Sequence, residues 1–182
     1  MGSMESLRLR DRIGPGVKVL FVGINPGMRS ALTGHHFAGY SNRFWRLLFD
    51  AGLVPVQLTY EDDDRLPEWG YGITNIVARP TSGMNDLRPD EFRADARILL
   101  RKIRRHQPAI VAVVGVTVWR ALLESLGEND ARVRPVAFGF QSELATETTR
   151  YFVLPNPSGR NANYTYDEML AAFKKLRAAV RG

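Results

Sequence analysis

Short apolar runs alternate with amphipathic stretches along the whole chain, and this alternation constrains the fold more than any other feature. Residues 109–114 (AIVAVV) form the clearest run, uninterrupted and followed by Gly115. Such runs are typical of strands buried on both faces of a sheet. Further strands are predicted at residues 17–22, 73–77, 136–140 and 151–154.

Between these runs, apolar residues recur at helical spacing. The predicted helical faces are Phe44, Leu47, Leu48 and Ala51; Phe92, Ala96, Leu99, Leu100 and Ile103; Trp119, Leu122, Leu123 and Leu126; and Met169, Leu170, Phe173 and Leu176. Gly52 is placed to end the first helix, and Thr165 with Glu168 predicts a capping box for the last. Residues 23–41 are expected to be a Gly-rich loop, and residues 61–64 a short helix or loop at the surface.

Strands that alternate with helices indicate an α/β fold: a three-layer α/β/α sandwich with a mostly parallel central sheet. Residues 1–16 are expected to be a leader that begins with a tag remnant, and residues 17–182 a single domain. In such sheets the ligand site lies beyond the carboxyl ends of the strands.

Composition narrows the possible functions. The 182 residues include no cysteine, which excludes disulfide scaffolds, thiol nucleophiles and Cys-ligated metal sites. A net charge of +6 and a pI of about 10.0 favour a polyanionic partner, although a solvated basic face has the same signature. No apolar run approaches the roughly 20 residues of a membrane span, and no signal peptide is visible, so a cytoplasmic protein without a membrane partner is expected.

Two loops that follow predicted strands carry the candidate chemistry. The first begins Gly23-Ile24-Asn25-Pro26-Gly27, and the second is Asn156-Pro157-Ser158-Gly159. Each alone is also a good turn former. Neither has the glycine spacing of a P-loop or a dinucleotide site, and no G-x-S-x-G serine motif is present.

An asparagine amide does not titrate, so Asn25 cannot be a general base, but its oxygen can hold a water molecule. Phe37 lies in the same Gly-rich stretch, where core packing is not its evident role. An aromatic ring beside an amide and free backbone donors suits a flat heterocycle that stacks and hydrogen-bonds along its edge.

These segments resemble the mismatch-specific uracil/thymine-DNA glycosylase family of the uracil-DNA glycosylase superfamily. The resemblance rests on residues 23–27, Thr33-Gly34-His35-His36-Phe37, Asn42-Arg43-Phe44-Trp45, residues 72–77 with Arg79-Pro80-Thr81, and residues 154–159, in that order along the chain. It implies an enzyme that flips uracil, thymine or a modified pyrimidine out of a G·U or G·T mispair. The enzyme then hydrolyses the N-glycosidic bond and leaves an abasic site, without a metal or organic cofactor.

The resemblance also implies roles for residues of the first loop. Asn25 matches the asparagine that positions the attacking water, and Phe37 matches the aromatic that stacks on the flipped base. The backbone near Ile24 and Phe37 would bond the pyrimidine edge. Ser30 and Ala31 are expected near the C5 edge of the base.

Two further residues near this loop have open interpretations. Asn75 is expected either to support the Asn25 loop or to be a satisfied amide at a strand end. Asp86 is the one loop carboxylate that could assist Asn25 as a base; a local cap before Pro89 and Asp90 is the preferred alternative.

The second loop is expected to enter the DNA duplex. By resemblance Gly159, Arg160 and Asn161 fill the gap left by the flipped base and contact the opposite guanine, and Asn156 and Pro157 are expected to bind DNA. Arg160 replaces the aliphatic wedge of the family, which leaves the preference for an opposite guanine open. Ser158 is expected to contact a phosphate, and Arg79 either a phosphate or the acidic residues 61–64.

The predicted partner is therefore double-stranded DNA, bound by a monomer. Two alternatives remain open: a glycosylase on the same fold that removes hypoxanthine or xanthine, and a lesion-binding module without catalysis.

Overall fold

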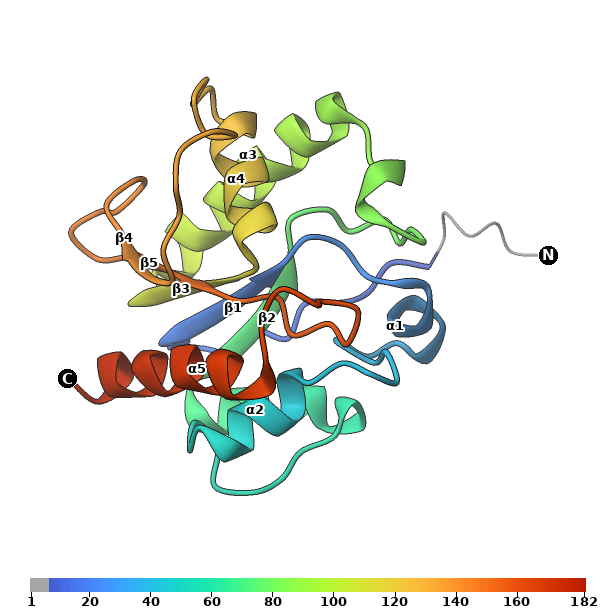
Figure 1. The fold of residues 1–182 in the computed structure, drawn as a ribbon, viewed down its shortest axis with the longest axis vertical. Helices are drawn as coiled ribbons and strands as arrows, with labels where there is room; N and C mark the ends of the chain where they lie inside the picture. The colour runs from blue at the N-terminus through green and yellow to red at the C-terminus, as the bar shows by residue number, and fades with distance from the viewer. Residues whose placement is uncertain (1–6) are drawn as a thin grey trace.

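A five-stranded sheet forms the centre of the molecule in the computed structural model, which describes residues 7–182 apart from the side chain of Met84 (Figure 1). The strand order is β2-β1-β3-β5-β4, and every neighbouring pair is parallel except β4 with β5. The strands are β1 (Val19–Gly23), β2 (Tyr71–Asn75), β3 (Ile110–Val114), β4 (Gly139–Gln141) and β5 (Arg150–Leu154). All five predicted strands are present, with ends shifted by at most three residues.

Helices cover both faces of this sheet, which confirms the three-layer α/β/α architecture. On one face, α2 (Phe44–Asp50) and α5 (Tyr166–Arg181) lie beside the 3-10 helix η2 (Tyr60–Trp69). On the other, α3 (Pro89–His106) and α4 (Val116–Ser125) pack together. Successive side chains of β1 alternate between these cores, with Phe21 in the first and Leu20 in the second, because strand side chains alternate between faces.

The predicted helix ends are close to those observed. At the start of α5, the Thr165 hydroxyl accepts from the Glu168 amide (3.2 Å), while the Glu168 carboxylate accepts from the Thr165 amide (2.7 Å), so the predicted capping box is confirmed. Helix α2 has Ala51 as its C-cap, one residue before the predicted Gly52, which follows with φ of +73°.

One local prediction is wrong, and another is confirmed only in part. Residues 23–41 are not all loop, because α1 (Met28–Thr33) forms there and ends at Gly34 in the left-handed conformation. The acidic residues 61–64 belong to the short helix η2, as predicted, and Glu61 and Asp64 are exposed, but Asp63 is completely buried. Its carboxylate accepts hydrogen bonds from the Arg12 guanidinium (3.2 Å) and the His36 amide (2.8 Å), which compensates its burial.

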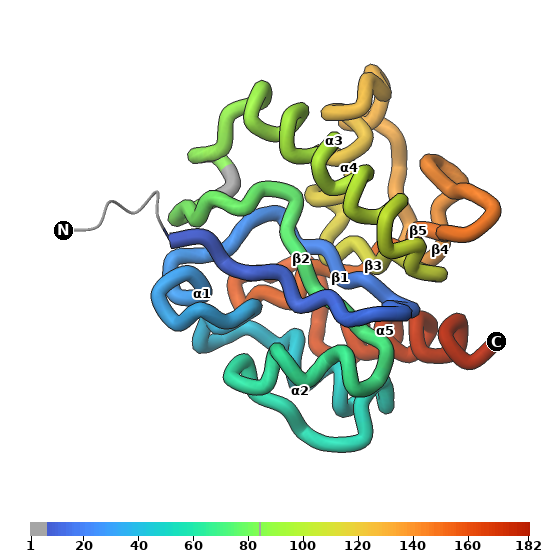
Figure 2. The backbone as a smooth tube through the Cα atoms, turned by 180° about the vertical axis from the view of Figure 1, so that it is seen from behind, coloured from blue at the N-terminus to red at the C-terminus, as the bar shows by residue number. Residues whose placement is uncertain are grey.

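The segment before β1 packs along the domain (Figure 2). Arg12 and Ile73 of β2 exchange two backbone hydrogen bonds of 3.0 and 2.9 Å in an antiparallel bridge, and Leu9 is buried. The tag remnant expected at the start of the leader lies outside the described residues. Across residues 7–182, no helix combines the length and the apolar character needed to cross a membrane.

Candidate active site

The carboxyl ends of four parallel strands bring the candidate residues to one edge of the sheet. Gly23 at the end of β1 is in register with Asn75 at the end of β2, and the Gly115 amide after β3 donates to the carbonyl of Leu154 in β5 (2.8 Å). The first loop (residues 24–43) and the second loop (residues 155–161) therefore start from the same edge.

The Asn25 side chain is held by its amide nitrogen. Nδ2 donates to the Thr81 hydroxyl (2.8 Å) and to the Arg79 carbonyl (3.1 Å), with a longer contact of 3.3 Å to the Pro26 carbonyl. The Thr81 hydroxyl in turn donates to the Gly83 carbonyl (2.7 Å). Among the described residues Oδ1 has no hydrogen-bond partner. The acceptor end of the amide is thus available to a water molecule.

Phe37 follows with a left-handed backbone (φ 49°), which is uncommon for an aromatic residue and is often found at functional positions. Its ring packs on Phe44 with centroids 4.3 Å apart and remains partly exposed. Its backbone N–H is paired with no described residue. The ring is therefore fixed on one side by the core and keeps a donor beside it.

A close approach at Gly23 brings Phe37 and Asn75 together. A Cβ on Gly23 would lie 2.7 Å from Asn75 Oδ1 and 3.6 Å from Phe37 Cζ, so a larger residue would displace the amide. The described hydrogen bond of the Asn75 side chain is made with His36 and not with Asn25: Asn75 Nδ2 lies 3.5 Å from His36 Nδ1. Asn75 therefore borders the Phe37 side of the site.

His36 orients that amide. It is 2 % exposed, and its Nε2 lies 2.8 Å from the Arg10 carbonyl, which can only accept. Burial lowers the pKa of His36, an effect partly offset by the Arg10 carbonyl and by the charges of Asp63 and Asp11. The ring is therefore neutral with its proton on Nε2, and Nδ1 is the acceptor that faces Asn75.

Ser30 and Ala31 lie on α1, and both are buried. The Ser30 hydroxyl accepts from the Ala38 amide (3.1 Å), which ties α1 to the residue after Phe37. The expected position of these residues near the C5 edge of a base stays a prediction.

The second loop is organised by its own polar groups. Asn156 Oδ1 accepts from the Ser158 amide (3.0 Å), Asn161 Nδ2 donates to the Asn156 carbonyl (2.9 Å), and Ser158 Oγ accepts from the Arg160 amide (3.3 Å). The Arg160 side chain is exposed. These bonds present the guanidinium at the tip of a compact turn.

The two loops touch each other. The Arg43 amide donates to the Pro157 carbonyl (2.9 Å), and a Cβ on Gly159 would lie only 2.3 Å from Ser41 Cβ. Between the loops is a cavity of about 560 Å³, named here the loop cavity. It is lined by Gly27, Met28, Arg29, Ser30, Gly39, Tyr40, Ser41, Asn42, Ser82, Ser158 and Arg160. Two arginines and no carboxylate line it, which suits an anionic ligand.

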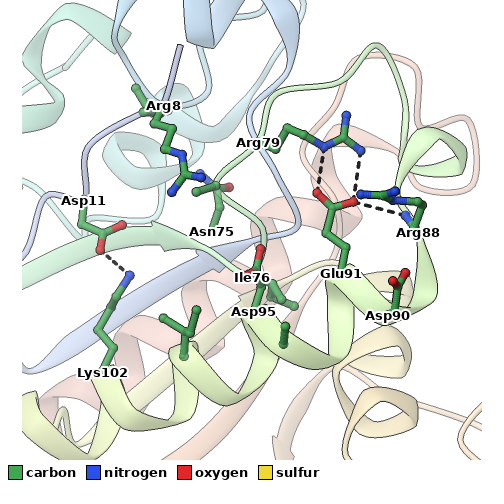
Figure 3. Close-up of a pocket in the computed structure, with 14 residues that line it drawn as sticks. Arg8, Asp11, Asn75, Ile76, Arg79, Arg88, Asp90, Glu91, Asp95 and Lys102 are labelled. Carbon is green, nitrogen blue, oxygen red and sulfur yellow. Dashed lines mark hydrogen bonds and ion pairs between the residues drawn. The ribbon is translucent and has the colours of Figure 1, made fainter. Parts of the chain in front are cut away.

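A larger cavity of about 630 Å³ lies between the segment before β1, the end of β2 and α3, and it has a different character (Figure 3). Its charges are largely paired, with Arg79 on Glu91 (2.7 Å) and Lys102 on Asp11. The hydrogen bond from Arg79 holds the pKa of Glu91 below its usual range. This balanced cavity offers a polyanion no net attraction, although Asn75 lines it. The loop cavity is therefore the better candidate for the path of a polyanion; its lining includes Ser30 and Arg160 but neither Asn25 nor Phe37.

Two expectations near this second cavity need correction. Arg79 pairs with Glu91 of α3, not with the acidic residues 61–64. Asp86 is exposed in the short 3-10 helix η3 (Met84–Asp86) and caps no helix, because the N-cap of α3 is Arg88. Its carboxylate has no described hydrogen-bond partner, and a role as a base stays a prediction.

The family model of the uracil DNA glycosylase superfamily matches residues 11–179. The chain belongs to the uracil-DNA glycosylase superfamily. Membership makes DNA the substrate and hydrolytic removal of a damaged base, as in base excision repair, the activity. The match starts within the segment expected to be a leader, in agreement with the packing of Arg12 on β2.

Sequence reasoning missed the residues that hold this candidate site together. Thr81 is within a matched motif, yet no role was predicted for it, because its partner Asn25 is 56 positions away. Ser41 and His36 likewise act through non-local contacts. The one available signal was that Arg79-Pro80-Thr81 follows a strand that ends at the same sheet edge as Asn25.

Proposed function

We propose that this chain is a monofunctional, mismatch-specific uracil-DNA glycosylase that acts on G·U mispairs in double-stranded DNA, with thymine in G·T pairs and modified pyrimidines as further candidate bases. The observation that carries the proposal is the orientation of Asn25. Its Nδ2 is occupied by Thr81 and Arg79, which leaves Oδ1 to accept a hydrogen bond from a water molecule.

In the proposed reaction the oxygen of that water bonds to C1′ of the deoxyribose while the bond from C1′ to the base nitrogen breaks. The electron pair of the broken bond leaves with the base. One proton of the water stays on its oxygen as the new C1′ hydroxyl, and the other is transferred, through solvent, to the departing base. In this proposal the Phe37 backbone N–H, beside the ring that stacks on the base, stabilises the negative charge on the base. A fixed donor of this kind lowers the barrier without a titrating acid.

Arg160 and its turn are the proposed duplex-entering group. A guanidinium can stack on a base and donate to guanine, and the contact of Gly159 with Ser41 places it beside the loop cavity. With a net charge of +6, binding is expected to weaken as salt concentration rises.

A panel of labelled oligonucleotides tests the proposal, with abasic sites revealed by alkaline strand cleavage. The substrates are G·U, A·U, G·T, single-stranded uracil and hypoxanthine, and G·U is expected to react fastest. Preferential release of hypoxanthine would instead identify a glycosylase for another damaged base. Retardation of damaged DNA without any abasic product would identify a lesion-binding module.

A further inference from the structure

Tyr40 of the first loop is an exposed aromatic residue that is nevertheless held in place. It is 90 % exposed, yet the guanidinium carbon of Arg29 lies 3.6 Å from the centre of its ring. Arg29 is itself anchored, since Nε donates to the Ala38 carbonyl (2.7 Å) and a terminal nitrogen lies 3.4 Å from the Tyr60 hydroxyl. The ring is therefore backed by a cation on one face and open to solvent on the other.

The ring lies where DNA is expected to pass. Tyr40 lines the loop cavity with Arg160 and is three residues from Phe37. Its neighbour Ser41 meets Gly159 of the second loop. Tyr40 thus shares the wall of the loop cavity with the proposed duplex-entering group and is close in sequence to the proposed base-stacking residue.

We propose that Tyr40, backed by Arg29, is a stacking platform for an unpaired nucleobase next to the target nucleotide, and that it gives the protein a site for single-stranded DNA. This inference rests on the proposed function, because it takes the loop cavity as the path of the DNA. A free aromatic face in a cavity without carboxylates suits a base carried by an anionic backbone. In a duplex, neighbouring bases cover one another, so the ring can reach only sugar and backbone edges.

Binding to fluorescein-labelled oligonucleotides that contain no lesion tests the platform without requiring catalysis. Tyr40→Ala is expected to weaken binding of a single strand by roughly 5- to 150-fold, the range for loss of one stacked base. The same variant should change duplex binding by less than about threefold, and Tyr40→Phe should keep single-strand affinity because the ring remains. The slope of affinity against salt should not change, since no charge is removed.

Leu32→Ala is the matched control. Leu32 is also a large exposed side chain of the first loop, 70 % accessible, but it does not line the loop cavity. Its truncation should leave both affinities unchanged. Equal losses on single-stranded and duplex DNA in Tyr40→Ala, or no loss on either, would overturn the platform.

Base release from G·U duplexes by the wild-type protein separates the two proposals. If uracil is released and Tyr40→Ala binds single strands normally, the platform is wrong and the glycosylase proposal stands. If no base is released and Tyr40→Ala still loses single-strand affinity, the platform stands and the glycosylase proposal is wrong.

Discussion

The two loops at the carboxyl edge of the sheet are held in opposite ways. The first loop is bonded to distant parts of the chain: Asn25 to Thr81, and the His36 amide to Asp63. The second loop is bonded mainly to itself, through Asn156, Ser158 and Asn161. Its described links to the first loop are the Arg43–Pro157 hydrogen bond and the contact of Gly159 with Ser41.

This difference separates two tasks. Groups that stabilise a transition state must be in place before the reaction, which favours the first loop for the chemistry. A compact turn with few hydrogen bonds to the rest of the chain can shift as a unit when a duplex arrives, which favours the second loop for DNA entry. Variants that damage one task and spare the other test this division.

The largest effect is expected from Asn25→Ala. Without the amide oxygen the water loses its acceptor, so the rate of base release should fall by about 100-fold or more, while affinity for duplex DNA is retained. Single-turnover release and fluorescence anisotropy measure the two quantities. Asn129→Ala, which removes an exposed amide far along the chain, is the control. Full activity of Asn25→Ala would refute the assignment of chemistry to the first loop.

Gly159→Ala tests the contact between the loops. The new Cβ would overlap Ser41, and such overpacking costs about 1 to 3 kcal/mol, so the second loop should move away and affinity for G·U duplexes should fall correspondingly. Affinity for G·U duplexes is measured first, and the rate of base release is then measured at saturating protein concentration. Gly182→Ala is the control, because a Cβ there meets no atom closer than 3.7 Å. Unchanged affinity would show that the contact does not set the position of the second loop.

Thr81→Val removes the hydroxyl that orients Asn25. The amide then loses one of its partners, and release at saturation should slow by about five- to tenfold, the value of one hydrogen bond. Duplex affinity should be unaffected, which distinguishes this change from Gly159→Ala. Thr81→Ser keeps the hydroxyl and should restore most of the rate. A loss of affinity in place of rate would contradict the role of Thr81 in the first loop.

The smallest expected effect is a pH dependence of the free energy of unfolding that arises from His36 in the first loop. Burial puts the pKa of His36 in the folded protein below its ordinary value of 6.5. The unfolded chain therefore takes up a proton on His36 more readily than the folded protein does. The contribution of the neutral His36 ring to the free energy of unfolding is complete above about pH 6.5 and is lost as the pH falls below that value. The charged neighbours of the ring are Asp63, Asp11 and Arg12.

Urea unfolding between pH 5 and pH 8 measures this dependence. The free energy of unfolding of the wild type should fall more steeply toward low pH than that of His36→Asn. The difference between the two slopes should correspond to uptake of up to about one proton on unfolding. His106→Asn, which alters a partly exposed ring outside the first loop, should behave as the wild type. Identical slopes in the wild type and His36→Asn would contradict the proposed buried neutral ring.

The layers of this fold could be predicted from the sequence because they follow from local periodicity. Burial of β3 is predicted by the uninterrupted apolar run at 109–114, and burial of one face of α5 by the helical spacing of Met169 and Phe173. Helix α1 could not be predicted in the same way, since its six residues between glycines are too few to show a periodic face. Asp63 was misplaced because an acidic run is normally exposed, and only the folded chain brings Arg12 and the His36 amide to it.

The same distinction applies to the site. The motif residues Asn25 and Phe37 could be proposed from the sequence, and the structure brings Phe37 and Asn75 together at Gly23. The direction of the Asn25 amide depends on Thr81, and the orientation of Asn75 on His36 and Arg10, which are distant in sequence. Single-sequence patterns do not encode such contacts.

The antiparallel bridge between Arg12 and Ile73 has a consequence for solubility. An open strand edge can pair with an edge of another molecule and begin aggregation. β2 is an outer strand of the sheet, and the bridge occupies backbone groups at its middle residue. At the opposite border β4 has only three residues, too few for an extended template. Removing the residues up to Arg12 would therefore leave the backbone groups of β2 free to pair with another molecule. Proteins that keep these residues should self-associate less than truncated ones.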